Sequence, residues 1–190
     1  KKVALDEPVA KHIPQFAELQ VLDGFNTNGT PNLRPVRKPV TLRHLLTHTS
    51  GFCYDTWSGE MVEYEKRGGA TPNGVAPFVP LMFEPGSRWH YGYSTDWTGR
   101  LVETVSGLTL EEYFQRNILK PLGMKDTSFV LPGEKFDRLV SRHQRQSGGS
   151  LQQDPRTPPA PPVAFNGGGG LYSTAGDYVR FMQMILRRGL

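Results

Sequence analysis

The pattern of apolar positions predicts two consecutive helices in the middle of the chain. Between residues 96 and 106, the apolar residues recur at helical spacing: Trp97, Leu101, Val102 and Val105. Gly107 ends this pattern. Thr109 followed by Glu112 has the form of a capping box, so a second helix is expected to run from there to about Leu119.

Three further segments show helical patterns. Residues 175–187 are expected to form a helix capped by Ser173 or Thr174. Its apolar stripe consists of Tyr178, Phe181, Met182 and Ile185. Thr41 is the expected N-cap of a short helix over residues 42–47, with a left-handed turn at Gly51 behind it. Residues 61–67 are expected to form one or two helical turns.

Signals for strands are few, and the expected loops are long. Residues 25–38 are rich in Asn, Gly, Thr and Pro and are interpreted as a loop. Residues 140–143 form a candidate short strand, and the Pro-rich residues 146–162 are expected to be a loop packed across the surface. Long loops within a compact domain are often functional, so the chain is expected to carry a site.

Composition excludes several classes of protein. The formal charge is +4 over 190 residues, and the basic side chains are scattered, which argues against a nucleic-acid partner. No apolar run is long enough to span a membrane. The single cysteine, Cys53, gives no sign of an oxidising compartment, so the cytoplasm is favoured over the periplasm without the compartment being settled. Both ends look cut out of something longer.

The candidate chemistry centres on Tyr91. It lies in a Gly-flanked turn just before the helix expected from Asp96, a placement that would hold a phenol over a cleft. A phenol becomes a useful base only where positive charge lowers its pKa, as at a lysine-activated serine. The alternative is a strand with aromatic residues on one face, since Trp89, Tyr91 and Tyr93 alternate.

Other polar clusters are better explained as structural features. His48 and Ser50 follow a helix and can satisfy its free carbonyl groups, and no Gly-x-Ser-x-Gly sequence surrounds any serine. The glycines at 167–170 match no nucleotide-binding pattern and are expected to allow either a close backbone approach or a tight bend before the next helix. His44 and His48 lack the acidic residue of a zinc helix, so no metal is expected.

Four segments, in order, resemble the serine β-lactamase-like family, which includes class C β-lactamases, D-alanyl-D-alanine carboxypeptidases and family VIII carboxylesterases. Residues 45–51 resemble its Leu-Leu-x-His-Thr-Ser-Gly segment, and residues 83–91 resemble Phe-x-Pro-Gly-x-x-Trp-x-Tyr. Residues 118–127 resemble Ile-x-x-Pro-Leu-Gly-Met-x-Asp-Thr, and residues 168–178 resemble the Gly-rich Leu-x-Ser-Thr-x-x-Asp segment.

The resemblance implies a two-lobed α/β (α+β) β-lactamase/transpeptidase-like fold, of which this chain would be mainly the helical lobe. It implies a serine hydrolase that forms an acyl-serine intermediate, with Tyr91 as the general-base partner. It places Tyr93, Gly168 and Gly169 at the substrate. Tyr93 stands where many members carry Asn, which favours a carboxylesterase acting on short-chain esters over a β-lactamase or carboxypeptidase. No cofactor is implied.

The family's nucleophile is the Ser of a Ser-x-x-Lys sequence, and none of the eight lysines here follows a serine at that spacing. A Lys-Thr-Gly sequence is also absent. We therefore expect residues 1–190 to be one partial domain that is inactive alone, with its oligomeric state open. A non-catalytic relative that uses the scaffold for binding or assembly is the alternative.

Overall fold

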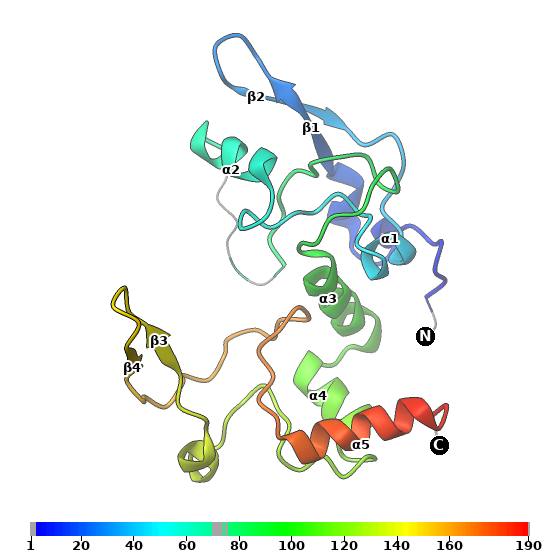
Figure 1. Ribbon diagram of the computed structural model, residues 1–190. Coiled ribbons are helices and arrows are strands. Elements are labelled where there is room, and N and C mark those ends of the chain that lie inside the picture. The colour runs from blue at the N-terminus through cyan, green and yellow to red at the C-terminus, as the bar shows by residue number, and fades with distance from the viewer. Residues whose placement is uncertain (1–2, 70–73, 75, 190) are drawn as a thin grey trace. The chain divides into compact units, whose positions relative to one another are not determined.

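In the computed structural model, residues 3–69, 74 and 76–189 are described. They form two compact units: Lys1–Asn117 with Ala164–Gly170, and Ile118–Val163 with Leu171–Leu190. Figure 1 shows the elements of each unit along the chain. Helices and long connections dominate the described residues, as expected from the sequence.

The first unit begins with two 3₁₀ helices, η1 (Val9–Lys11) and η2 (Pro14–Glu18), and then a hairpin. Strand β1 (Gln20–Phe25) pairs antiparallel with β2 (Pro31–Pro35), with a register shift between Leu22 and Phe25. The expectation of a loop over residues 25–38 is therefore wrong for β2. The turn-forming residues 26–30 lie between the strands, where Asn28 Oδ1 accepts hydrogen bonds from Thr30, and their composition concealed the pairing on either side.

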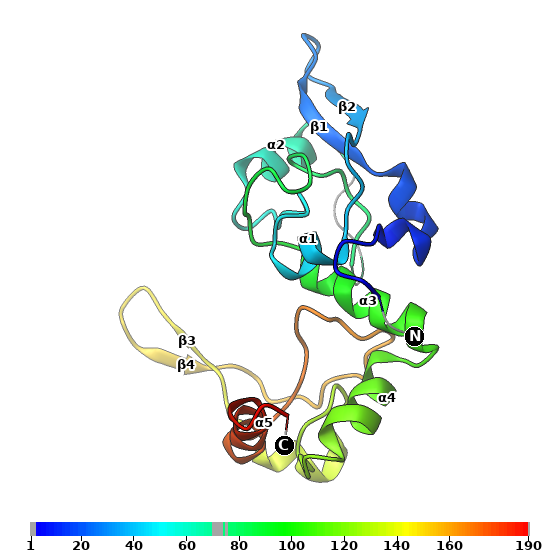
Figure 2. The same cartoon turned by 90° about the vertical axis from the view of Figure 1, so that its right-hand side faces the viewer.

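The helices of this unit follow the hairpin: α1 (Leu42–Leu46), α2 (Gly59–Lys66), α3 (Ser94–Ser106) and α4 (Leu110–Phe114). Both expected capping positions are confirmed, at Thr41 and Thr109, since each side chain accepts from the backbone of the third residue on. Gly107 ends α3 with a φ of 72°. In Figures 1 and 2, α1 lies beside α3.

The core of the first unit forms around the aromatic side chain of Trp97 on α3. Its ring contacts that of Phe16 edge to face, with centroids 4.9 Å apart, and stacks on Phe52 at 5.9 Å. Leu45 of α1 is fully buried, whereas its neighbour Leu46 is 53% exposed. The buried apolar residues of α1 and α3 belong to one core. Hydrogen bonds of Ser94 and Asp96 join the first turn of α3 to residues 50–54.

The π-helical turn η3 (Gln115–Leu119) leads from the first unit into the second, which contains η4 (Gly133–Arg138), β3 (His143–Arg145), β4 (Leu151–Gln153) and α5 (Ala175–Leu186). The strand expected at 140–143 begins only at its last residue, and the expected loop 146–162 contains β4. These two short strands form an exposed hairpin, visible as an arm in Figure 2. The helix expected from Thr109 to about Leu119 is confirmed as α4 continued by η3.

Helix α5 is held by its buried acid, Asp177. The carboxylate accepts from the backbone N–H of Asp126 at 2.7 Å and from Thr127 Oγ1 at 3.0 Å, and it pairs with Arg180. Thr174 caps the helix, as expected. The apolar stripe is present, but Tyr178, Met182 and Ile185 are exposed by 58%, 44% and 59%.

Candidate active site

Tyr91 lies in the connection that leads into α3. Gly86 has a φ of 83°, and the helix begins three residues after Tyr91, at Ser94. A Cβ on Gly92 would lie 2.3 Å from the carbonyl oxygen of Phe52, so only glycine permits this approach of the two segments. The expected turn is confirmed, and residues 89–93 are not a strand.

Aromatic rings surround the half-buried Tyr91. Its ring centroid lies 4.6 Å from that of His48, 5.2 Å from Trp57 and 5.6 Å from Tyr54. Three contacts from two different segments fix the direction of the phenol ring. A general acid or base must lie within hydrogen-bond reach of the proton it moves, and a ring held in one direction can be positioned in that way.

Behind these rings, Tyr54 donates a hydrogen bond to Asp96. The distance from the Tyr54 hydroxyl to Asp96 Oδ2 is 2.7 Å, and Asp96 is only 2% exposed. Burial and the neighbouring carboxylate raise the pKa of Tyr54 well above its usual value. Asp96 lies in the first turn of α3, where the helix dipole favours negative charge. Sequence reasoning missed this pair because its members are far apart in the chain, and the acid in a first turn was the only signal.

Tyr93 also packs against Tyr54, with ring centroids 4.4 Å apart. Burial raises the pKa of Tyr93 to about 12, so its phenol stays neutral near pH 7. Tyr91, Tyr54 and Tyr93 thus form one cluster at the start of α3. A contact of Tyr93 with substrate remains a prediction.

The glycine-rich segment runs along the same end of α3. A Cβ on Gly167 would lie 2.4 Å from the carbonyl oxygen of Thr95, and one on Gly168 would lie 2.7 Å from Asp96 Oδ2. The expected close backbone approach is confirmed. Gly168 is therefore placed beside the Tyr54–Asp96 pair, whereas a Cβ on Gly169 would meet nothing within 4 Å. Their role in substrate binding stays a prediction.

His48 and Ser50 do not form a nucleophile and base. Ser50 is fully buried and shares a hydrogen bond of 2.7 Å with the hydroxyl of Ser94. His48 has a left-handed backbone with a φ of 54°, and its Nε2 lies 3.4 Å from Thr95 Oγ1. Burial lowers the pKa of His48 below its usual value, which keeps the ring neutral against Tyr91.

The part of the chain that the structure describes contains neither a metal-binding cluster nor a membrane-spanning helix. No group of three His, Cys, Asp or Glu side chains there could hold a metal ion. His44 Nδ1 instead accepts from the backbone of Thr41 in the cap of α1. None of the described helices is long and apolar enough to cross a membrane.

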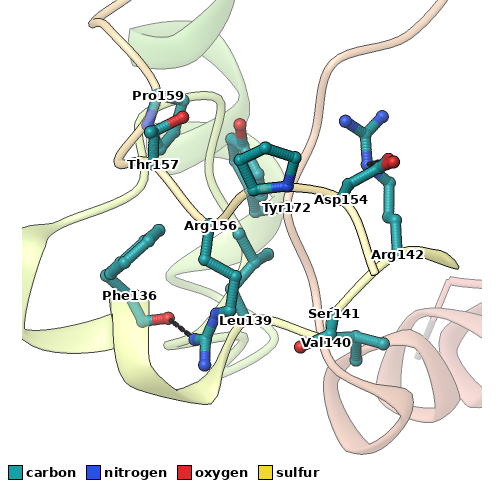
Figure 3. Close-up of a pocket in the computed structure, with 11 residues that line it drawn as sticks. Phe136, Leu139, Val140, Ser141, Arg142, Asp154, Arg156, Thr157, Pro159 and Tyr172 are labelled. Carbon is teal, nitrogen blue, oxygen red and sulfur yellow. Dashed lines mark hydrogen bonds and ion pairs between the residues drawn. The ribbon is translucent and has the colours of Figure 1, made fainter. Parts of the chain in front are cut away.

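Two surface pockets differ in the side chains that line them. An open pocket of about 460 Å³ is lined by Trp57, Trp89, His90 and Tyr91. A pocket of about 450 Å³ in the second unit is drawn in Figure 3. There, Arg156 donates to the carbonyl oxygen of Phe136 at 2.9 Å, and Arg142 pairs with Asp154 at 3.5 Å. Arg156 and Arg142 of the second pocket are thus engaged with the protein. The pocket at Tyr91 is the candidate site because Tyr91, the candidate base, lines it.

Known proteins resemble this chain along nearly its whole length. The family model described as Beta-lactamase matches residues 1–190. Monacolin J acid methylbutanoyltransferase of Aspergillus terreus is 38% identical over 202 residues, which cover 98% of this chain and 47% of that protein. Lovastatin esterase of Penicillium rubens is 33% identical over 204 residues, 97% of this chain and 49% of that protein. The chain spans about half the length of these relatives.

A solved structure shows the same fold. The LovD6 mutant of simvastatin synthase from Aspergillus terreus superimposes with a TM-score of 0.87 at 39% identity. The match covers 98% of this chain and 46% of that one.

Proposed function

Since the chain belongs to the beta-lactamase family, we propose that it carries the proton-transferring phenol of a serine enzyme that moves acyl groups between oxygen atoms. The observation that carries this proposal is Tyr91, held by three aromatic contacts at an open pocket. The relatives of this chain include both acyltransferases and an esterase, which supports acyl transfer as the common chemistry.

In the proposed reaction, Tyr91 starts as a phenolate stabilised by the positive charge of the lysine of the Ser-x-x-Lys sequence. It takes the proton of the serine hydroxyl as the serine oxygen attacks the carbonyl carbon of an ester. The tetrahedral intermediate collapses, the bond to the alcohol oxygen breaks, and the proton passes from Tyr91 to that oxygen. The acyl group remains on the serine until water or an acceptor alcohol removes it by the same steps in reverse. The serine and its lysine belong to a Ser-x-x-Lys sequence that these residues do not contain.

Carboxylester hydrolysis with short acyl groups is the activity we propose for the whole protein. The phenol of Tyr93 replaces the amide that many members use, which removes a contact suited to β-lactam or peptide substrates. Transfer to an alcohol is the second candidate, because the transferases among the relatives share up to 38% identity with this chain. A non-catalytic role on the same scaffold is the third.

We further propose that these residues form one partial domain, mainly the helical lobe of a two-lobed enzyme. The elements of both units support it, since the described strands are short and the helices lie between long connections. The 190-residue chain alone is then expected to be inactive, because the nucleophile lies outside it.

The test uses the full-length protein with p-nitrophenyl butyrate, with and without an added alcohol. Replacing Tyr91 by Phe keeps the ring and removes the hydroxyl group that would exchange the proton. The kcat should therefore fall by a factor of about 10²–10⁴. Tyr178→Phe on α5 is the matched control and should leave kcat unchanged. Near-normal turnover by Tyr91→Phe would remove Tyr91 from the mechanism, and ester formation faster than hydrolysis would identify a transferase.

A further inference from the structure

Two tryptophan side chains lie exposed beside the candidate base. Trp57 is 61% exposed and Trp89 is 64% exposed, whereas Trp97 in the core is 4% exposed. Tryptophan has a large apolar surface and is mostly buried in folded proteins. Two exposed indole rings at one pocket therefore indicate a surface that binds an apolar group.

Both indole rings contact other aromatic side chains of the site. The Trp57 ring lies 5.2 Å from that of Tyr91 and 6.2 Å from that of Tyr54, and the Trp89 ring lies 6.4 Å from that of His48. The neighbouring residue His90 donates its backbone N–H to the carbonyl oxygen of His48 at 2.9 Å. A surface fixed in this way loses little side-chain entropy when it binds a ligand.

The adjoining segments are also fixed. Arg88, next to Trp89 in the chain, stacks over the ring of Phe83 and pairs with Glu60 of α2 at 2.7 Å. Ser58, next to Trp57, caps α2 by accepting from the backbone of Met61. Helix α2 thus connects the two tryptophan-bearing segments.

The pocket between these rings suits a neutral ring-shaped group. It is an open surface pocket, and its four lining side chains include no carboxylate, lysine or arginine. An anionic or strongly polar group would find no charged partner among the lining residues. A flat apolar ring can instead stack on an indole face.

The position of Tyr91 decides which half of the substrate meets this surface. In the proposed reaction, Tyr91 gives its proton to the alcohol oxygen, so the alcohol must lie within hydrogen-bond reach of the phenol. The pocket is lined by Tyr91 itself together with the two tryptophans. The acyl group, by contrast, stays on the serine, which is outside these residues.

We propose that Trp57 and Trp89 form the alcohol subsite of the enzyme and select neutral alcohols that carry an apolar ring. This inference rests on the proposed function, since it takes Tyr91 as the proton donor to the alcohol. It goes beyond that function by naming the alcohol class and the residues that select it.

The test compares two butyrate esters, methyl and 2-naphthylmethyl, with the full-length protein and a pH-stat assay. The selectivity ratio is kcat/KM for the naphthylmethyl ester divided by kcat/KM for the methyl ester. Trp57→Ala and Trp89→Ala should each lower this ratio about tenfold, through KM, because stacking area is lost. Trp57→Phe keeps a ring and should lower it less, and Tyr178→Ala, at an exposed aromatic residue on α5, should not change it.

A ratio unchanged in both tryptophan variants would overturn the subsite while leaving the esterase intact. A protein that hydrolyses neither ester would contradict the proposed function instead, and calorimetric titration with 2-naphthylmethanol would then decide the subsite separately. Binding that weakens about tenfold in Trp57→Ala supports the subsite, and equal binding by wild type and both variants, or no binding by wild type, overturns it.

Discussion

The hydrogen bond between Tyr54 and Asp96 gives the sharpest test of how the site is built. Tyr54→Phe removes only the hydroxyl that lies 2.7 Å from Asp96 Oδ2 and retains the ring that contacts Tyr91 and Tyr93. Asp96 is 2% exposed, so water cannot readily replace the lost donor. A hydrogen bond to a charged group contributes about 1.5–3 kcal/mol. The free energy of unfolding should therefore fall by about that amount, which is roughly a 10- to 100-fold change in the folding equilibrium.

The assay is urea unfolding of the full-length protein, followed by circular dichroism, in a double-mutant cycle with Asp96→Asn. If the hydrogen bond is responsible, the double variant should be less destabilised than the sum of the two single variants. Tyr93→Phe is the matched control: the described residues provide no hydrogen-bond partner for its hydroxyl, and its loss should cost less than about 0.5 kcal/mol. Strict additivity, or a stability of Tyr54→Phe equal to that of Tyr93→Phe, would refute this account.

Three further predictions concern the surroundings of the cluster. Gly167→Ala places a Cβ 2.4 Å from the carbonyl oxygen of Thr95 and should cost about 1–3 kcal/mol in urea unfolding, whereas Gly169→Ala, with nothing within 4 Å, should change stability by less than about 1 kcal/mol; equal effects would contradict the close approach. Burial lowers the pKa of His48, so the unfolded chain binds a proton more readily and stability should fall as the pH drops below the ordinary value of 6.5. His48→Asn, which tolerates the left-handed backbone, should reduce that fall when unfolding is measured at about pH 7 and about pH 5; an unchanged pH dependence would be evidence against it. Burial raises the pKa of Cys53 to about 12, so its thiol should react with Ellman's reagent at about pH 8 only after denaturation, and rapid labelling of the native protein would count against that environment.

Local signals in the sequence predicted the helices well. The caps at Thr41, Thr109 and Thr174 are confirmed, because a capping side chain and the backbone group it binds lie within one turn. The predicted end of the helix capped by Thr41 was less accurate. It stops at Leu46, and His48 already takes a left-handed backbone before Gly51 does, which residue type alone does not reveal.

Pairing between distant segments could not be predicted in the same way. The β1–β2 hairpin was hidden because strand pairing depends on a partner and on burial more than on composition. At the site, Tyr91 was found from its turn and from the family resemblance. Tyr54 and Trp57 were missed, since they reach Tyr91 only through the close packing of Gly92 on residues 52–53.

The stripe on α5 has a practical consequence for work with these residues alone. Tyr178, Met182 and Ile185 would be presented to solvent on one side of a regular helix. Such a surface attracts hydrophobic dyes, chromatography resins and other copies of the chain. A recombinant protein limited to residues 1–190 should therefore be purified at low concentration and checked by light scattering, and α5 is the first place to introduce a solubilising lysine.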